Sequence, residues 1–423
     1  MSETLIERRR RLMGPNVATF YDDPVHIVRG KGVWLWDLDG RKYLDCYNNV
    51  AHVGHCHPKV VDAIAKQAAI LNTHTRYLHE GVLDYIERLT GKFGDDLTQA
   101  IMVCTGSEAN DIALRMARAM TGKTGIIATD NTYHGNTTAV SQLSARRPPI
   151  GGSPAHVRLV PAPDSLRPVG GTMEGQAEAF ARNIAHAIVD LEEAGHGFSG
   201  MMLCPIFANE GLPALPKGFL DPALGIIRRA RGLILCDEVQ PGFGRVGTHW
   251  WGHEKMGFTP DVVTLGKPMG NGHPVAAVIA RQEVMTEFRE AFGYFNTFGG
   301  NPVSAAAAMA TLDVIENEGL VENAKMVSDY LFERLQELQH PLIAEARGVG
   351  LFFGLEFVDE NGVPASKFTN LLVNGMRREG VLLGEIGRHD NILKLRPPLP
   401  FSMDNADLAI NKLEKVLKAT PIT

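Results

Sequence analysis

The sequence predicts an α/β fold in which a large domain carries a mostly parallel sheet and a smaller α+β domain is attached to it. Between residues 51 and 300, short apolar runs of strand type alternate with amphipathic runs of helical period. This alternation is typical of a parallel sheet that is covered by helices on both faces. The chain has 423 residues, which is too many for one simple core, so a second domain is expected.

The first 50 residues are expected to form an N-terminal arm that belongs to the small domain. In this arm, WLWDLDGRKYLD (34–45) places a DG turn between two alternating runs, which indicates a β-hairpin. Two helical patterns follow at 60–71 and 82–89, and the polar turn between them contains one permanent cation, Arg76. A charge in such a turn is usually solvated, but it can also bind an anion.

Residues 51–302 are expected to form the large domain around a sheet of seven strands. The strand patterns are AIMVCT (100–105), GIIAT (125–129), HVRLV (156–160), GMMLCPI (200–206), LILCDE (233–238), VVTLG (262–266) and AAVIA (276–280). Helical patterns lie between them, for example SEANDIALRMARAM (107–120) and AFARNIAHAIVDLEEA (179–194). Sheets of this type bind ligands at the carboxyl ends of their strands, so the site is expected there.

Residues 303–423 are expected to complete the small domain together with the arm. An alanine-rich helical pattern (303–320) follows the turn GGNP, and the region ends in the helical pattern NADLAINKLEKVLKA (405–419). No internal repeat is visible along the chain.

The composition argues against several classes of protein. The net charge is −6 and no block of like charges occurs, whereas a nucleic-acid surface needs a basic face. The five cysteines include no CxxC pair, so a disulfide framework or a zinc ribbon is not expected. The N-terminal residues lack the apolar segment of a signal peptide, and no run of 18 apolar residues exists. We therefore expect a cytoplasmic protein without a membrane partner.

A lysine and an aspartate follow two of the expected strands. Lys267 comes after VVTLG and is the only charged residue between Asp261 and Arg281. A loop lysine at a strand end is the ordinary interpretation, but a desolvated amine with a lowered pKa is suited to a Schiff base. Asp237 ends the run LILCD, where a buried carboxylate needs a cation or a donor such as a protonated pyridine nitrogen.

Two further stretches have features of a cofactor site. Gly106 and Ser107 lie where a strand passes into a helix, whose free N–H groups and dipole hold phosphates, although an ordinary helix N-cap has the same pattern. Tyr133 follows GIIAT and can stack on a planar ring or simply pack, and His134 beside it receives no role. The run GFGRVG fits GxGxxG, but Pro241 precedes it and no clear helix follows, so a dinucleotide site is rejected.

Together these stretches resemble one family, the class III aminotransferase-like enzymes of fold type I, which depend on pyridoxal 5′-phosphate (PLP). The resemblance extends from RGKGVWLWDLDGRKYLD to LKLRPPLP, and the combination of DEVQ-x-GFGR-x-G, a following lysine and TFGGNP is specific. It implies that Lys267 forms the Schiff base with PLP and that Asp237 pairs with the pyridinium nitrogen. The other implied cofactor contacts are Gly106 and Ser107 to the phosphate, Tyr133 and Val239 to the ring faces, Gln240 to the ring hydroxyl, and Thr297 of a partner subunit to the phosphate. A homodimer with active sites at the interface is therefore implied.

Three departures from the family pattern concern the substrate. Most members transfer amino groups and hold the acceptor carboxylate with an arginine, where this chain has Lys394 in KLRPPL, with Arg396 two residues on. Lysine offers a point charge suited to a phosphate, whereas arginine grips a planar carboxylate. A Glu-Pro pair is replaced by Cys204-Pro205, and the loop DCYNNVAHVGHCHP (45–58) is altered. The histidines of HCH in this loop are expected to pack rather than to bind a metal.

These departures coincide with a subgroup, the O-phosphoethanolamine phospho-lyases. The similar runs are NNVAHVGHCHP, LNTHTRYLH and the long run from GFGRVGTHWWGHEKMGFTPD to VVTLGKPMGNGHPVA. The resemblance implies elimination of phosphate from O-phosphoethanolamine, which yields acetaldehyde, ammonia and phosphate. Arg76 is the first candidate to bind the substrate phosphate, Lys394 and Arg396 are the next, and Asn48 or Asn49 are candidate donors.

Four alternatives stay open at this point. The chain could be an ω-aminotransferase that moves an amino group from an amine to a keto acid such as pyruvate, because the cofactor residues serve both reactions. It could also be a PLP-binding protein without turnover, which the intact pair of Lys267 and Asp237 argues against. A phosphorylated amino acid larger than phosphoethanolamine, and a tetramer in place of a dimer, are likewise open.

Overall fold

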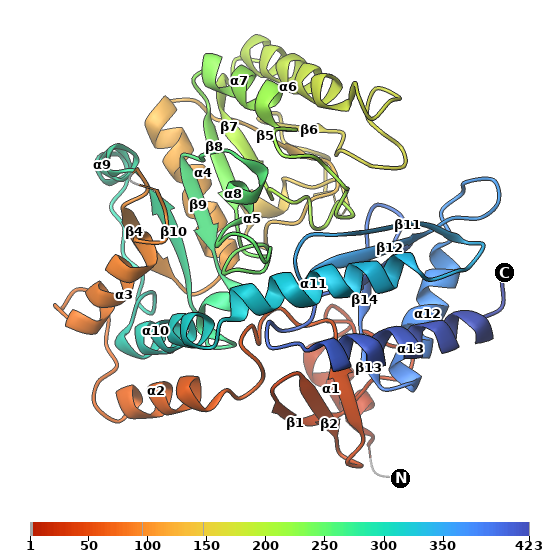
Figure 1. The fold of residues 1–423 in the computed structure, drawn as a ribbon. Coiled ribbons are helices and arrows are strands. Elements are labelled where there is room, and N and C mark those ends of the chain that lie inside the picture. The colour runs from red at the N-terminus through yellow and green to blue at the C-terminus, as the bar shows by residue number, and fades with distance from the viewer. Residues whose placement is uncertain (1–2, 95, 147, 423) are drawn as a thin grey trace.

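The computed structural model describes residues 3–94, 96–146 and 148–422, and a sheet of seven strands lies at its centre (Figure 1). In spatial order the strands are β4 (Gln99–Val103), β10 (Ala276–Ala280), β9 (Val262–Leu265), β8 (Leu233–Asp237), β7 (Phe198–Leu203), β5 (Gly125–Thr129) and β6 (Val157–Val160). The strands from β9 to β6 run parallel to their neighbours. This confirms the expected α/β fold with a mostly parallel seven-stranded sheet.

Strand β10 is reversed and pairs antiparallel with both β9 and β4. The connection from β9 to β10 contains only a short 3₁₀ helix, η1 (Lys267–Gly270). A parallel pair needs a crossover of roughly a dozen residues or more, usually through an α-helix, so this short segment reverses the chain instead.

Helices cover both faces of the sheet, and alternate residues of each strand face them. Leu235 of β8 packs with the cluster formed by α4 (Gly106–Thr121) and α9 (Gln282–Ala291), whereas Ile234 packs with that of α6 (Gln176–Glu193) and α7 (Asp221–Arg229). Because both faces are buried, the inner strands β8 and β10 are buried along their whole length, whereas the edge strands β4 and β6 carry the polar residues Gln99 and Arg158.

Other helices surround this sheet and complete the large part of the molecule. Helix α10 (Pro302–Asn317) packs against α2 (Pro58–Ala68) and α3 (Glu80–Thr90). The short helices α5 (Thr138–Ser141) and α8 (Gly252–Met256) follow β5 and β8.

The smaller α+β part joins segments that are far apart in the chain. Strands β1 (Ile27–Lys31), β2 (Trp34–Asp37) and β3 (Lys42–Asp45) form one sheet with β13 (Val381–Leu382), which runs parallel to β3. A second sheet has the order β11 (Ile343–Gly348), β12 (Phe353–Phe357), β15 (Ile392–Leu395) and β14 (Gly384–Ile386). Helices α11 (Leu320–Gln336), α12 (Ser366–Arg378) and α13 (Met403–Ala419) pack around them. The domain boundaries at 50/51 and 302/303 stay predictions.

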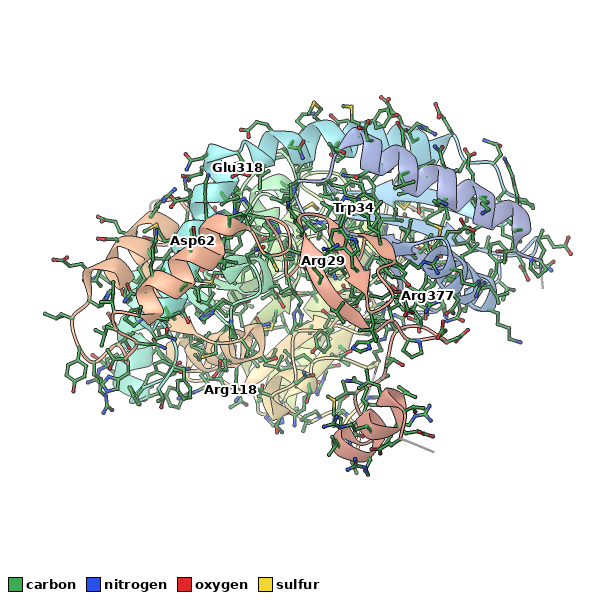
Figure 2. All side chains as sticks on the ribbon, turned by 90° about the horizontal axis from the view of Figure 1, so that it is seen from below. Arg29, Trp34, Asp62, Arg118, Glu318 and Arg377 are labelled. Atoms are coloured by element: carbon green, nitrogen blue, oxygen red, sulfur yellow. The ribbon has the colours of Figure 1, made fainter. Side chains whose placement is uncertain are left out.

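Helix α1 (Leu5–Met13) extends away from the body of the molecule, below the sheet that carries Arg29 and Trp34 (Figure 2). It begins with a capping box of Thr4 and Glu7 and buries none of its residues within the chain. In the part of the chain that the structure describes, no helix is both long enough and apolar enough to cross a membrane.

Candidate active site

A cavity lies at the carboxyl ends of the parallel strands and brings together most of the predicted cofactor residues. It is lined by Gly106, Ser107, Tyr133, Asp237, Val239, Gln240 and Lys267. These residues come from β4–α4, β5, β8 and β9, which end at the same edge of the sheet. The arrangement agrees with the rule that doubly covered sheets bind ligands at this edge.

Lys267 is the first residue of η1 and is held in an unusual backbone conformation. Its φ is +24°, in a region that few side-chain-bearing residues adopt, which is a feature of functional sites. Burial lowers the pKa of the Lys267 amine, and the charge of Arg396 lowers it further, against the opposing charge of Asp237. A larger share of this amine is therefore unprotonated than for an exposed lysine, which favours both nucleophilic attack and proton abstraction.

Asp237 ends β8 inside a complete set of donors. Its Oδ2 lies 2.6 Å from Nδ1 of His134 and accepts a hydrogen bond of 3.0 Å from the Asn110 amide, while its Oδ1 accepts the N–H of Val239 at 3.0 Å. Burial alone would raise the pKa of the Asp237 carboxyl, but the hydrogen bond and charge of His134, then the Val239 N–H and Lys267, hold it below its ordinary value. Asp237 is thus kept ionised in a buried position.

His134 and Asn110 are the functional residues that sequence reasoning missed. The His134 side chain is fully buried and accepts or donates at Nε2 to the Thr132 hydroxyl, 2.9 Å away. Asn110 also donates to the His134 carbonyl at 2.7 Å and accepts from the Thr264 hydroxyl at 2.6 Å. Asn110 lies one helical turn after Gly106, a spacing that places both on one face of α4 and could have indicated its role.

The start of α4 and the loop 133–136 form a close cradle at the other end of the cavity. Thr105 caps α4, so the N–H groups of Gly106 and Ser107 are left for a ligand. A Cβ on Gly106 would lie 3.0 Å from Val239 Cγ2, and one on Gly135 would lie 2.5 Å from Ser107 Oγ. Glycine is thus required where the backbone approaches. The cavity fits PLP, because it offers the Lys267 amine for the aldehyde, the Asp237 carboxylate for the ring nitrogen and the N-terminus of α4 for the phosphate.

Lys394 on β15 and Arg396 just after this strand are buried and are not among the residues that line the cavity. Arg396 donates to the Gln240 side chain and to the Tyr47 carbonyl at 3.1 Å, and the Lys394 ammonium lies 4.7 Å from the centre of the Tyr47 ring. Burial lowers the pKa of Lys394 well below its ordinary value, with the charges of Arg396 and Lys267 next, and burial lowers the pKa of Arg396 to about 10. Gln240 was expected to bond the ring hydroxyl, and here its oxygen accepts from Arg396.

Other predicted substrate residues lie at different distances from this cavity. Asn49 is buried next to Val50, which lines the cavity, and its amide nitrogen has no hydrogen-bond partner among the described residues. Asn48 accepts the Val50 N–H at 3.0 Å and lines a separate groove beside α1.

Arg76 and Thr297 do not meet Lys267 within one chain. Arg76 lines a second cavity, where its guanidinium lies 3.9 Å from the centre of the Phe295 ring. Thr297 is exposed two residues after Phe295. Both residues therefore belong to one surface region, made of 74–79 and 294–300.

One buried group of potential metal ligands occurs among the described residues, formed by Cys236, Glu238 and His253. Glu238 accepts the N–H groups of Gly252 and His253 and lies 2.9 Å from His253 Nδ1, so this group is a hydrogen-bonded network. In the HCH run, His55 pairs with Asp45 and His57 with Glu318.

Similar proteins include enzymes of two kinds. The chain is 39% identical over 419 residues to the alanine–glyoxylate aminotransferase 2-like protein of Drosophila melanogaster, which covers 95% of this chain and 84% of the relative. It is 35% identical over 436 residues to the ethanolamine-phosphate phospho-lyase homolog 1 of Caenorhabditis elegans, with 98% and 93% covered.

A solved structure of a phospholyase from Arthrobacter in complex with phosphoethanolamine superimposes with a TM-score of 0.95. It is 41% identical in sequence, and the match covers 99% of this chain and 100% of that chain. Residues 17–417 match the model of the family described as Aminotransferase class-III. With a cavity that fits PLP and a match over nearly its whole length, the chain belongs to the class-III aminotransferase family of PLP-dependent enzymes.

Proposed function

We propose that this enzyme is a phospho-lyase that eliminates phosphate from O-phosphoethanolamine and, with one water to hydrolyse the remaining enamine, yields acetaldehyde, ammonia and phosphate. The observation that carries the proposal is the pair of buried cations Lys394 and Arg396 beside the half-buried Lys267: the charge of Arg396 lowers the pKa of both lysines, and that of Lys267 lowers the pKa of Lys394. Within the described residues no carboxylate forms an ion pair with any of them. Buried charges without partners are costly, so this cluster of three cations is suited to a ligand with more than one negative charge.

The carboxyl groups whose charges reach the cluster, Asp45, Asp237 and Glu385, form no ion pair with it among the described residues, and Asp45 is paired with His55. Asp237 is engaged by His134 and Asn110 at the other end of the cavity. Burial raises the pKa of Glu385, the charge of Asp390 adds to this, and the charge of Lys394 opposes it. A phosphate dianion would offset two positive charges, whereas the carboxylate of a keto acid would offset one.

The residues of the chain divide the chemistry between them. Bound PLP supplies an electron sink for the carbon next to the substrate nitrogen. Asp237 keeps the ring nitrogen of the cofactor protonated, and the N-terminus of α4 holds its phosphate. The amine of Lys267 takes the proton from the carbon that carries the substrate nitrogen, because it stays within reach of that carbon. Lys394 and Arg396 stabilise the negative charge that builds on the departing phosphate.

Arg76 completes this phosphate site from a partner subunit in our proposal. Arg76 and Thr297 share one surface region, so a dimer that brings the partner subunit's Thr297 to the cofactor phosphate also brings the partner subunit's Arg76 to the cavity. A homodimer with shared sites is therefore part of the proposed function.

The deciding experiment measures phosphate and acetaldehyde released from phosphoethanolamine with no keto acid present. Stoichiometric release of both supports the lyase. The phospho-lyase names of two similar proteins support this expectation, whereas the aminotransferase name of the Drosophila relative favours the second candidate, an ω-aminotransferase. Amino transfer to pyruvate without phosphate release would establish that second candidate instead.

Mixed dimers test whether Arg76 acts across the interface. Subunits with Arg76→Ala are combined with subunits with Lys267→Ala, so that a shared site regains both residues in the mixed dimer. Activity above that of either homodimer is expected. Activity no higher than the mean of the two homodimers would place Arg76 in its own subunit's site or in none.

A further inference from the structure

The short helix η1 lies between two residues with unusual backbone conformations. Lys267 at its start has a φ of +24°, and Asn271, which caps its end, has a φ of +48°. Residues with a side chain seldom adopt such values, although asparagine tolerates them better than lysine. Backbone hydrogen bonds from Met269 to the Gly266 carbonyl and from Asn271 to the Pro268 carbonyl close this turn. A short strained turn persists where the surrounding structure holds it, so η1 needs support from outside.

The side chain of Asn271 supplies this support with two hydrogen bonds. Its Oδ1 accepts the N–H of Val53 at 2.9 Å, and its amide nitrogen donates to the Gly54 carbonyl at 2.9 Å. A backbone N–H only donates and a carbonyl only accepts, so these partners fix the orientation of the amide. Asn271 therefore links η1 to two residues that lie 218 and 217 positions earlier in the chain.

Residues 51–54 are themselves held at several points. His52 Nε2 donates to the Phe243 carbonyl at 2.7 Å, because a carbonyl can only accept, and the His52 carbonyl accepts the N–H of Leu399 at 2.8 Å. Val53 is buried in the core. Since this segment has contacts of its own, it can hold η1 in place rather than move with it.

The two segments that Asn271 links both border the active-site cavity. Val50 lines the cavity just before residue 51, and Gly272 and His273 line it directly after Asn271. Asn271 itself is not among the described residues that line the cavity. It therefore has to act through Lys267 and not through contact with a substrate.

We propose that Asn271 is a positioning residue that fixes η1 and so holds the amine of Lys267 within reach of the substrate carbon that loses its proton. Without the two bonds, η1 can relax toward an ordinary backbone conformation, and the amine moves with it because Lys267 is the first residue of η1. A base has to lie within hydrogen-bond reach of the proton that it takes, and small displacements lower the rate. The inference rests on the proton transfer proposed for Lys267. It holds for a lyase and for an aminotransferase alike, because both reactions need this step.

Two variants of Asn271 test its side chain, and an asparagine elsewhere provides the control. Asn271→Gly removes both hydrogen bonds and still permits a φ of +48°. Asn271→Asp keeps an acceptor for the N–H of Val53 but loses the donor to Gly54. Asn374→Ala is the matched control, because Asn374 is 4% exposed, accepts the N–H of Asp22 at 3.0 Å and lines neither of the two cavities.

Two measurements on the holoenzyme separate positioning from a purely structural role. In a single turnover with phosphoethanolamine, the amplitude counts the sites that hold PLP, and the rate reports the steps up to loss of the substrate proton and the phosphate. The absorbance of bound PLP as a function of pH, without substrate, reports the surroundings of the Lys267 nitrogen. A purely structural role would lower the amplitude and leave the rate of the remaining sites unchanged.

We expect Asn271→Gly to react roughly tenfold to a hundredfold more slowly with the amplitude of the wild type, and to shift the pH midpoint of the absorbance. Asn271→Asp should lie between Asn271→Gly and the wild type, because one of the two bonds remains. Asn374→Ala should match the wild type in rate, amplitude and midpoint.

Three results for Asn271→Gly would overturn the inference: the rate of the wild type, a loss of amplitude alone, or an unshifted midpoint. If Asn271→Gly does not fold, Asn271→Asp decides by the same criteria. If the wild type does not react with phosphoethanolamine, the lyase proposal has failed, and the same variants are compared in amino transfer to pyruvate. If Lys267→Ala keeps the absorbance midpoint of the wild type, the role of Lys267 has failed rather than that of Asn271.

Discussion

The two ends of the active-site cavity are built on opposite principles. The Asp237 carboxylate is fully engaged, since His134 and Asn110 contact it and Thr264 satisfies Asn110 in turn. Around Lys394 and Arg396, two buried cations lie close together, and the described residues supply no carboxylate partner to either. The Asp237 end, where the carboxylate has partners, is suited to a cofactor that stays bound. The Lys394 and Arg396 end, where the cations lack a carboxylate partner, is suited to a substrate that binds and leaves. The cofactor end serves every reaction of the family, so the substrate end decides between reactions.

The largest expected effect follows from a change at the Asp237 end. Asp237→Asn should lower phosphate release and any amino transfer together, each by about 10²–10³-fold, because both reactions need the protonated ring nitrogen. Glu238→Gln is the matched control, since this neighbouring buried carboxylate bonds His253 and not His134, and it should keep most of the activity. Retention of one activity with loss of the other would show that the cofactor end also selects the reaction.

A smaller effect is expected when Lys394 is replaced by arginine, which keeps the positive charge and changes the geometry of the donors. Lys394→Arg should lower kcat/KM for phosphoethanolamine by roughly tenfold to a hundredfold, about 1.5–3 kcal/mol, the value of a hydrogen bond to a charged group. Amino transfer to pyruvate should rise, because arginine grips a carboxylate with two parallel bonds. Lys415→Arg on the exposed face of α13 serves as the control. If Lys394→Arg left the ratio of phosphate release to amino transfer unchanged, the substrate end would not decide between the two reactions.

Arg76→Ala tests whether the substrate end extends beyond a single chain. The kcat/KM for phosphoethanolamine should fall at least about tenfold, or ~1.4 kcal/mol, while the absorbance of bound PLP persists. Arg29→Ala is the matched control, because Arg29 also stacks on an aromatic ring, Trp36, at 4.1 Å, outside both cavities. An unchanged kcat/KM would remove Arg76 from the phosphate site.

The smallest effect concerns the cost of the unpaired cations. Lys394→Met should raise the free energy of unfolding by about 1–2 kcal/mol at neutral pH, because a buried charge is replaced by an apolar group of similar length. Equilibrium unfolding in urea, with the cofactor-loaded enzyme in each case, measures the change. Added phosphate should stabilise the wild type more than the variant, since a ligand stabilises the state that binds it.

The pH dependence of this stability has a defined sign. Burial lowers the pKa of Lys394 in the folded state, so at pH values below that pKa the full cost of the buried cation is present. As the pH rises from the folded pKa toward the ordinary value, the folded state loses the proton first and the wild type gains stability. Lys394→Met should lack this gain, and a loss of stability in the same window would contradict the assignment.

Most of the sheet and of the cofactor site could be predicted from the sequence, for local reasons. Buried parallel strands are apolar runs, and ligand-binding side chains follow their carboxyl ends. This rule placed Asp237 correctly at the end of β8 and Lys267 just after β9. The reversal of β10 could not be predicted, because AAVIA is buried on both faces in either direction. The role of His134 depends on β5 lying beside β7 and near β8, an order that no local pattern contains.

The substrate end was less accessible to sequence reasoning. Lys394 and Arg396 are two residues apart, a spacing that predicted a shared strand face, but β15 ends at Leu395 and the burial of Arg396 depends on non-local contacts with Gln240 and the Cys46 carbonyl. Arg76 was predicted to bind the substrate phosphate, whereas within one chain it lines a second cavity, and in our proposal a partner subunit brings it to the phosphate site.

The pairing of β13 with β3 has a consequence for how the enzyme is made. Leu44 on β3 pairs in register with Val381, and its N–H bonds the Gly380 carbonyl, so all seven strands of the large sheet are synthesised before β3 gains β13 as a neighbour. The N–H of Arg396 likewise bonds the Cys46 carbonyl at 2.6 Å. Until then the hairpin has an open edge, which invites pairing with other nascent chains. Such non-local contacts slow folding. Lys394 and Arg396 are also synthesised after the residues of the cofactor cradle. The residues that would bind PLP are therefore synthesised before the residues that would bind the phosphate of the substrate.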